Sequence, residues 1–121
     1  MFLGIDIGTS EVKVLLLTPG HQVLGSAGAA LEVSRPHPGH SEQNPHDWWA
    51  ATQSALAQLR TAHPQEFAAV QGIGLSGQMH GAVLLDAQDQ VLRPAILWND
   101  TRSATECTEM MAELAPPSAP R

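Results

Sequence analysis

Hydrophobic positions divide the chain into a strand-rich first third and a mixed region that follows it. Runs of Ile, Val and Leu predict paired strands at 2–7 and 12–18, with a less regular strand at 23–33. A Pro-Gly turn and the short spacing between these runs favour an antiparallel meander. Two prolines within three positions then exclude a helix or an interior strand, so we expect 34–41 to be a loop.

The first helix is expected to begin at Asn44-Pro45, because Asn is a favourable N-cap and proline fits the first helical position. Apolar residues recur at helical spacing up to Leu59, and His63-Pro64 marks the end of the pattern. We expect Trp48 and Trp49 to anchor this helix, Trp48 against the sheet.

The remaining pattern predicts strands at 69–75 and 83–85 and a final helix that ends at Leu114. The Pro-rich residues 115–121 are not expected to form regular structure. The chain therefore divides into one domain segment at 1–114 and a tail.

Polar turns follow three of the strands, after Ile5, Leu75 and Leu97. In open α/β sheets, ligands bind beyond the carboxyl ends of the strands. If these strands share one sheet, the three turns converge on a single crevice, and that crevice is the candidate site.

The first of these turns carries groups that suit a magnesium nucleotide. Asp6 ends a strand and can hold Mg²⁺ through water, since Mg²⁺ gives up its hydration shell reluctantly. Gly8 lets the backbone approach closely, and the hydroxyls of Thr9 and Ser10 can donate to phosphate oxygens. The turn joins two strands, unlike a P-loop, which opens a helix. An ordinary hairpin turn is the alternative, because Gly, Asp and Ser are common in turns for local reasons.

Composition limits the partners. The 121 residues carry a net charge of −6, which argues against nucleic acid or an anionic membrane as a partner but leaves room for a local phosphate site. A single cysteine, Cys107, excludes an intramolecular disulfide and suits a reducing compartment. No apolar run is long enough to span a bilayer, and no signal peptide is evident, so we expect a cytoplasmic protein.

Together the motifs resemble the N-terminal part of the FGGY carbohydrate kinases, and within that family the xylulokinases. The Asp-x-Gly-Thr motif is shared with actin and the chaperone ATPases, whereas Gln-Met-His-Gly followed by Trp-Asn-Asp is more selective. The resemblance extends from Phe2 to about Cys107, and five segments carry it: Gly4–Ser10 with Lys13, Ser34–Pro38, Ser41–Trp49, Gly77–Gly81 and Leu92–Arg102.

The resemblance implies an α/β protein with the ribonuclease-H-like (actin-like ATPase) fold, in which flanking helices cover a mixed sheet containing an antiparallel meander. It also implies ATP and Mg²⁺ as cofactors. Asp6 would hold the metal through water, and the phosphates would face four residues: Gly8, Thr9, Ser10 and Lys13. Glu11 departs from the family pattern, since a carboxylate beside phosphates is unfavourable unless it points to solvent.

The same resemblance implies a ketopentose pocket with D-xylulose as substrate. Met79 and His80 would line the pocket beside Gln78, with His80 hydrogen-bonding sugar hydroxyls. The edge of the pocket would be formed by Trp98, Asn99 and Asp100. Two alternatives stay open here: Trp98 can belong to the core, and Asp100 can simply cap the final helix.

The implied reaction converts ATP and D-xylulose to ADP and D-xylulose 5-phosphate. Family members are several times longer, and their catalytic Asp and adenosine pocket lie beyond this segment. No residue here is assigned as catalytic, and we expect the chain to be inactive without the missing C-terminal kinase portion. The alternatives are a non-catalytic sugar- or nucleotide-binding remnant and a structural piece of an ATPase fold. An uncovered apolar sheet face would favour a homodimer.

Overall fold

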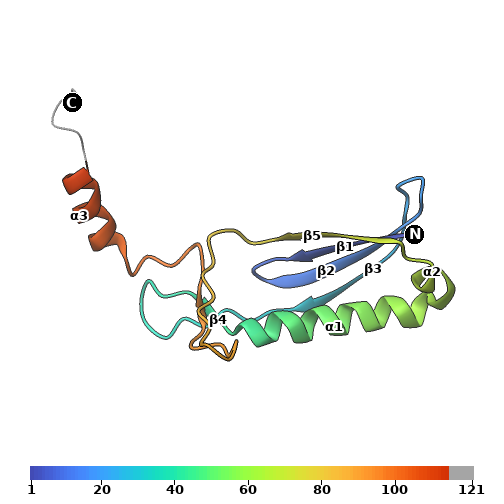
Figure 1. Ribbon diagram of the computed structural model, residues 1–121, viewed down its shortest axis with the longest axis horizontal. Helices are drawn as coiled ribbons and strands as arrows, with labels where there is room; N and C mark the ends of the chain where they lie inside the picture. The colour runs from blue at the N-terminus through green and yellow to red at the C-terminus, as the bar shows by residue number, and fades with distance from the viewer. Residues whose placement is uncertain (115–121) are drawn as a thin grey trace, which may run out of the picture.

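A computed structural model of the chain describes residues 1–114, and the tail expected at 115–121 lies outside the described residues. Figure 1 shows a layer of strands with one long helix beneath it and a short helix that projects from the far end. The elements in chain order are β1 (Phe2–Ile7), β2 (Glu11–Leu17), β3 (Val23–Ala30), β4 (Glu42–Gln43), α1 (Pro45–Ala62), α2 (Pro64–Ala68), β5 (Gly72–Gly77), β6 (Ala95–Ile96) and α3 (Ala104–Leu114).

The main sheet has four strands in the order β3-β2-β1-β5. The predicted meander is confirmed, since β1 pairs with β2 and β2 with β3, both antiparallel. β5 joins β1 in parallel, with Ile7 opposite Gly77 at the end of the ladder. The turns that follow β1 and β5 therefore leave the sheet at the same edge.

The core lies between α1 and the β1–β2–β3 part of the sheet. Val12, Val14 and Leu16 are fully buried against a helix face that includes Ala55 and Leu59. The helix begins as predicted, with the Asn44 side chain accepting from the His46 N–H as an N-cap. This packing fixes β1, and hence the position of the turn that follows it.

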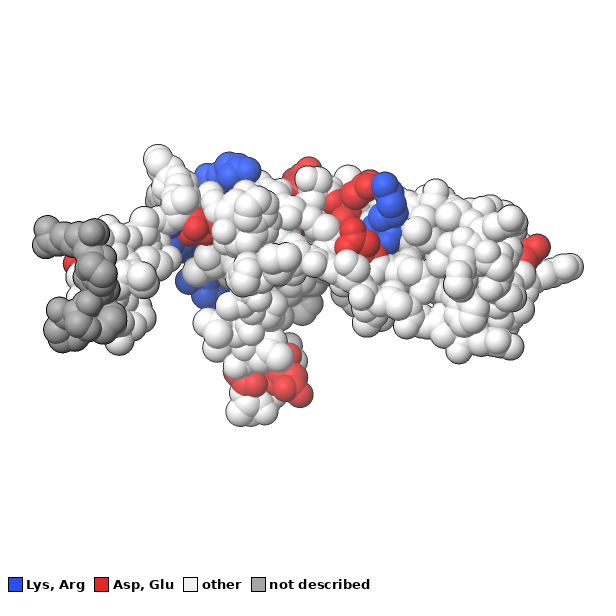
Figure 2. Space-filling view, turned by 90° about the horizontal axis from the view of Figure 1, so that it is seen from above, with Lys and Arg blue, Asp and Glu red and all other residues white. Residues whose placement is uncertain are grey.

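The β5 side of the sheet has little cover. Ile73 and Leu75 pair with Leu3 and Ile5 and so lie on the face that α1 packs against, yet they are 60% and 77% exposed. In Figure 1 the helix lies beneath β2 and β3, at a distance from β5. Viewed from above in Figure 2, most of the surface carries neither acidic nor basic side chains.

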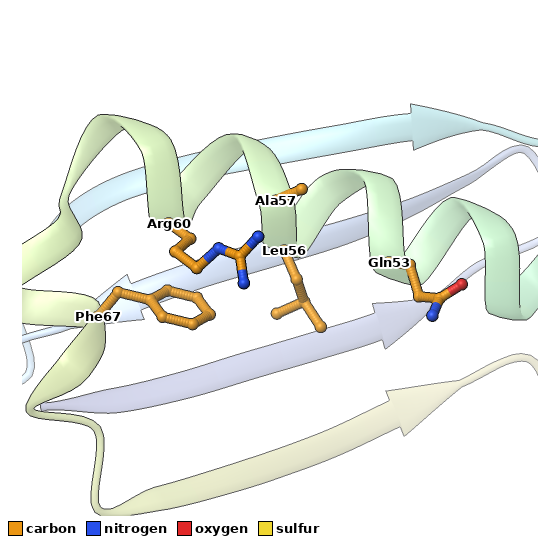
Figure 3. Close-up of a pocket in the computed structure, with 5 residues that line it drawn as sticks. All are labelled: Gln53, Leu56, Ala57, Arg60 and Phe67. Atoms are coloured by element: carbon orange, nitrogen blue, oxygen red, sulfur yellow. The ribbon is translucent and has the colours of Figure 1, made fainter.

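A groove runs along the flank of α1. It has a volume of about 420 Å³ and is lined by five residues: Gln53, Leu56, Ala57, Arg60 and Phe67. Figure 3 shows Phe67 extending from α2 beside α1 toward Leu56, with the Arg60 guanidinium between them. The described residues leave open both this groove and the exposed side chains of Ile73 and Leu75 in β5.

Two strand predictions need correction. No strand forms at 83–85, where the only pairing is an isolated bridge between Leu85 and Val91. Leu84 and Leu85 are about half exposed, because no described strand lies beside them to complete a sheet. The strand expected at 69–75 begins only at Gly72, since the short helix α2 and its cap at Ala69 take up the preceding residues.

The two tryptophans of α1 differ. Trp48 packs against the core as predicted. The expectation that Trp49 anchors the helix is wrong, because its side chain is 64% exposed. The buried positions of α1 include Thr52 and Ala55, and Trp49 lies on a different side of the helix.

Candidate functional site

The three polar turns meet where β1 and β5 end, but the expectation that their strands share one sheet is wrong, because β6 pairs with β4 in a separate two-stranded sheet. Between the three turns lies a cavity of about 440 Å³. Its lining contains residues from all three turns: Asp6, Gly8, Thr9, Gly77, Gln78, Met79 and Trp98. The parallel pairing of β1 with β5 brings the first two turns together, and β6 delivers the third.

Thr9 joins the three turns through its side chain. Its hydroxyl donates to Gln78 Oε1 at 3.1 Å, across the gap between the first and second turns. The same oxygen accepts from the indole N–H of Trp98 at 3.2 Å, which connects the third turn. Trp98 is still 58% exposed and lines the cavity. In the described structure it is therefore part of the cavity wall and not of the core.

The first turn is tight. The amide of Gly8 donates to the Glu11 carbonyl at 3.0 Å, and a Cβ at position 8 would lie 3.0 Å from that oxygen. A larger residue at this position would therefore force the turn to open. Ser10 is exposed, and its carbonyl accepts from the Leu31 amide at 2.8 Å.

Asp6 and Lys13 face each other across the β1–β2 ladder, and both are exposed. They also share the lining of a second hollow of about 560 Å³ on the open face of the sheet. Lys13 Nζ lies 3.1 Å from Glu11 Oε1, and both side chains are about half exposed. Glu11 thus points to solvent. Among residues 1–114, no group of three or more His, Cys, Asp or Glu side chains is placed to hold a metal.

The second turn presents Met79 and His80 to solvent. Met79 is 68% exposed and lines the cavity, whereas His80 is exposed but is not among the lining residues. The backbone of His80 has φ of 63°, in the left-handed region. This region is sparsely populated by residues other than Gly, although His is among those found there more often.

In the third turn, Asn99 and Asp100 point inward. Asn99 Oδ1 is buried and has no hydrogen-bond partner among the described residues. The Asp100 side chain is only 2% exposed and accepts from the Ser41 amide at 2.6 Å and from Arg102. Of the predicted site residues, the structure leaves these outside the cavity lining: Ser10, Lys13, His80, Asn99 and Asp100.

Comparison with known proteins identifies the family. A model of the N-terminal domain of the FGGY family of carbohydrate kinases matches residues 1–119. The chain belongs to this family. The FGGY relatives include the xylulose kinase of Escherichia coli K12, which is 53% identical over 114 residues, covering 94% of this chain and 23% of the relative. The xylulose kinase of Klebsiella pneumoniae is 55% identical over 107 residues, covering 88% of this chain and 22% of the relative.

Solved structures of FGGY proteins agree with the fold. The kinase from Brucella ovis superposes with a TM-score of 0.89 at 59% identity, covering 92% of this chain and 23% of that one. The xylulose kinase from Rhodospirillum rubrum gives 0.88 at 35% identity, covering 93% and 23%. The actin-like ATPase fold is thereby confirmed. The chain spans about a quarter of the length of the relatives it matches.

An ion-pair cluster holds the third turn of this FGGY domain in place. Arg102 Nη2 lies 2.7 Å from both Glu42 Oε1 and Asp100 Oδ2, and Arg93 Nη2 lies 2.8 Å from the same Glu42 oxygen. The hydrogen bond from Arg102 is the main reason that the pKa of Asp100 lies well below its usual range. It is also the main reason that the pKa of Glu42 is lowered, and the two carboxylates raise the pKa of Arg102.

The sequence predicts no role for Gln43, although this residue lies in the segment Ser41–Trp49, which carries the family resemblance. Gln43 is 3% exposed, and its Nε2 donates to the Thr9 carbonyl at 2.7 Å. Its Oε1 accepts from Trp48 Nε1 at 2.9 Å and from Gln78 Nε2 at 3.0 Å. The only local signal was a polar residue just before a helix cap, which is common and does not indicate a site.

Proposed function

We propose that this chain is the N-terminal part of an ATP-dependent kinase that phosphorylates D-xylulose to D-xylulose 5-phosphate. The observation that supports this most directly is the cavity shared by three turns, one suited to phosphate and two suited to a polyol. The names of the xylulose kinases that match most of the chain support D-xylulose as the proposed substrate. Phosphoryl transfer relies mainly on positioning and charge neutralisation, which is what such a crevice provides.

Asp6, Gly8, Thr9, Ser10 and Lys13 form the proposed nucleotide side. The exposed Asp6 carboxylate fits a Mg²⁺ ion that keeps most of its water, and the metal would neutralise phosphate charge when bound. Lys13 is held only by an exposed ion pair with Glu11, which is weak enough to be exchanged for a phosphate.

The proposed sugar side combines Gln78, Met79 and His80 with Trp98. Met79 and Trp98 offer apolar contact at the cavity, and the His80 imidazole can hydrogen-bond hydroxyls at its mouth. We place Asn99 and Asp100 at the edge of the pocket, where they support the third turn without lining the cavity. The Asp100 carboxylate is occupied by Arg102 and Ser41, so we assign it the support of the edge and not a sugar hydroxyl.

The general base and the adenosine site would come from the remaining kinase chain, because no carboxylate lining the cavity except Asp6 is available to take a proton. The same remainder would cover the groove of Figure 3 and the exposed side chains of β5. The chain alone would be inactive. Among residues 1–114, no helix is long and apolar enough to cross a membrane. The similarity to xylulose kinases, which act on a small metabolite, supports a cytoplasmic location.

Isothermal titration with D-xylulose and, separately, with Mg-ATP tests this assignment. His80→Ala is expected to abolish saturable xylulose binding. His21→Ala is the matched control, since His21 is exposed, has a φ of 62° and lies in the β2–β3 turn, outside the cavity lining. Equal behaviour of the two variants would contradict the proposed sugar side.

Catalysis is tested by supplying the missing part. The chain is co-expressed with the portion of the Escherichia coli xylulose kinase that follows the matched 114 residues. Xylulose-dependent release of ADP is expected from the pair and from neither part alone. A folded chain that binds xylulose but gives no turnover with the added portion would favour the second candidate, a non-catalytic binding remnant.

A further inference from the structure

A continuous series of hydrogen bonds runs from Trp48 to Trp98 and includes three residues that line the cavity. Trp48 donates to Gln43, Gln78 donates to Gln43, Thr9 donates to Gln78 and Trp98 donates to Thr9, with distances between 2.9 and 3.2 Å. All five side chains belong to different elements or turns. The series links the helix α1, the strand β4 and all three turns of the site.

The amide orientation of Gln43 is fixed by its neighbours. The Trp48 indole N–H can only donate, so it must meet the amide oxygen of Gln43. On the other side, the carbonyls of Thr9 and Glu32 can only accept, so they must meet the amide nitrogen at 2.7 and 3.2 Å. A flipped Gln43 would lose all three bonds inside a site where it is 3% exposed.

This orientation is passed on to Thr9. Because Gln43 presents its oxygen, Gln78 must donate with Nε2 and present its own oxygen to Thr9. The Thr9 hydroxyl must then give its proton to Gln78, and it accepts from the Trp98 indole, which is again only a donor. The hydroxyl proton is used, and one lone pair on Thr9 Oγ1 is left.

We propose that Gln43 is a positioning residue that makes Thr9 present a hydrogen-bond acceptor to the cavity. An acceptor suits a sugar hydroxyl. It does not suit a phosphate oxygen, which at neutral pH also accepts. The proposed place of Thr9 on the nucleotide side therefore requires its hydroxyl to release Gln78 before it can donate to phosphate. That the group donating to Thr9 is a sugar hydroxyl rests on the proposed function. The direction of the hydrogen bonds does not rest on it.

Indole N–H signals in ¹⁵N NMR spectra test, without any ligand, whether the hydrogen bonds connect Gln43 through Gln78 and Thr9 to Trp98. Gln43→Leu is expected to shift the signals of both Trp48 and Trp98, although Gln43 touches only Trp48. Thr9→Val is expected to shift Trp98 alone, and Thr9→Ser to restore it. The exposed Trp49 is the internal reference. Gln58→Leu, which removes an exposed Gln bonded to the Gly28 carbonyl, is the matched control.

A Trp98 signal that stays in place in Gln43→Leu while Trp48 shifts would overturn the proposal. If Gln43→Leu does not fold, the Thr9 pair decides: Thr9→Val must shift the Trp98 signal, and an unshifted signal overturns the proposal.

Titration with xylulose and with Mg-ATP tests the effect on ligand binding. The xylulose affinity of Gln43→Leu is expected to fall by about tenfold, as for the loss of one hydrogen bond, with little change for Mg-ATP. An equal fall for both ligands would overturn the positioning role. If the wild-type chain binds no xylulose, the proposed function is in question and the indole signals still decide the inference.

Discussion

The two halves of the four-stranded sheet show how strongly a covering helix determines the burial of side chains. On the α1 side, Val14 and Leu16 are fully buried, whereas Leu75 of β5 lies on the same face and is 77% exposed. Strand pairing does not account for this difference, since β1 pairs over its full length with β2 and with β5. The difference comes from where α1 lies (Figure 1).

The candidate site straddles this boundary. Its first turn follows the well-packed β1, and its second turn follows the poorly covered β5. The Gln78 side chain donates to Gln43 and accepts from Thr9. These hydrogen bonds help to fix the second turn, where little packing does so. The comparison shows that a half-covered strand can still hold a defined turn.

The largest expected effect is on the packed half. Leu16→Ala removes a fully buried side chain and is expected to lower the free energy of unfolding by about 2–5 kcal/mol. Leu75→Ala, the matched change on the open half, is expected to cost less than about 0.5 kcal/mol. Urea titrations followed by circular dichroism compare the two. Equal losses would break the comparison, because they would mean that something covers β5 in solution.

The next effect concerns the ion-pair cluster. Arg102→Met leaves the Glu42 and Asp100 carboxylates without their shared partner and is expected to lower the urea midpoint clearly, but by less than Leu16→Ala. Arg93→Met is the control and should have little effect, since Arg93 is more exposed than Arg102 and pairs with one carboxylate, Glu42, where Arg102 pairs with two. A larger loss for Arg93→Met would contradict the described roles.

The same cluster predicts acid sensitivity. The lowered pKa values of Asp100 and Glu42 mean that the unfolded chain takes up protons at a higher pH than the folded chain. This contribution to stability is therefore complete above the unfolded values, near about pH 4, and is lost as the pH falls toward the folded values. Between about pH 6 and about pH 3, the free energy of unfolding should fall less steeply with falling pH in Asp100→Asn than in the wild-type chain. Glu113→Gln, an exposed change in α3, should keep the wild-type slope.

The smallest expected effect is weak self-association through the open half. Sedimentation at about micromolar concentration should detect dimers of the free chain, since exposed apolar strands favour pairing. Leu75→Glu is expected to give monomers, whereas Leu114→Glu, at the end of α3, should leave the association unchanged. A monomeric wild-type chain would count against a homodimer and leave the remaining kinase chain as the proposed cover of β5.

Local signals in the sequence predicted much of the fold. The Ile, Val and Leu runs gave the meander, and Asn44-Pro45 gave the start of α1. These features depend on neighbouring residues, so a single segment contains the information. The strand at 83–85 failed because a strand also needs a partner, and no described strand lies beside those leucines.

The site was predicted less completely, for the same reason. The meeting of the first two turns followed from the pairing of β1 with β5, whereas the third turn follows β6, which belongs to a separate sheet. The cavity lining includes Asp6, Thr9 and Met79. Gln43 was missed because its partners Thr9 and Gln78 lie 34 and 35 positions away. The roles of the individual residues toward ATP and sugar stay predictions.

The left-handed backbone at His80 affects which substitutions this position would accept during evolution. A histidine there is held in a conformation that Asn or Gly adopts more easily, so the fold alone gains nothing from keeping it. Under selection for folding alone, substitutions at codon 80 would be accepted with neutral or improved stability. His80 would be lost repeatedly in a laboratory lineage selected only for soluble expression. Its retention in a lineage that also expresses the complementing kinase portion and grows on xylulose would separate the needs of folding from those of sugar binding.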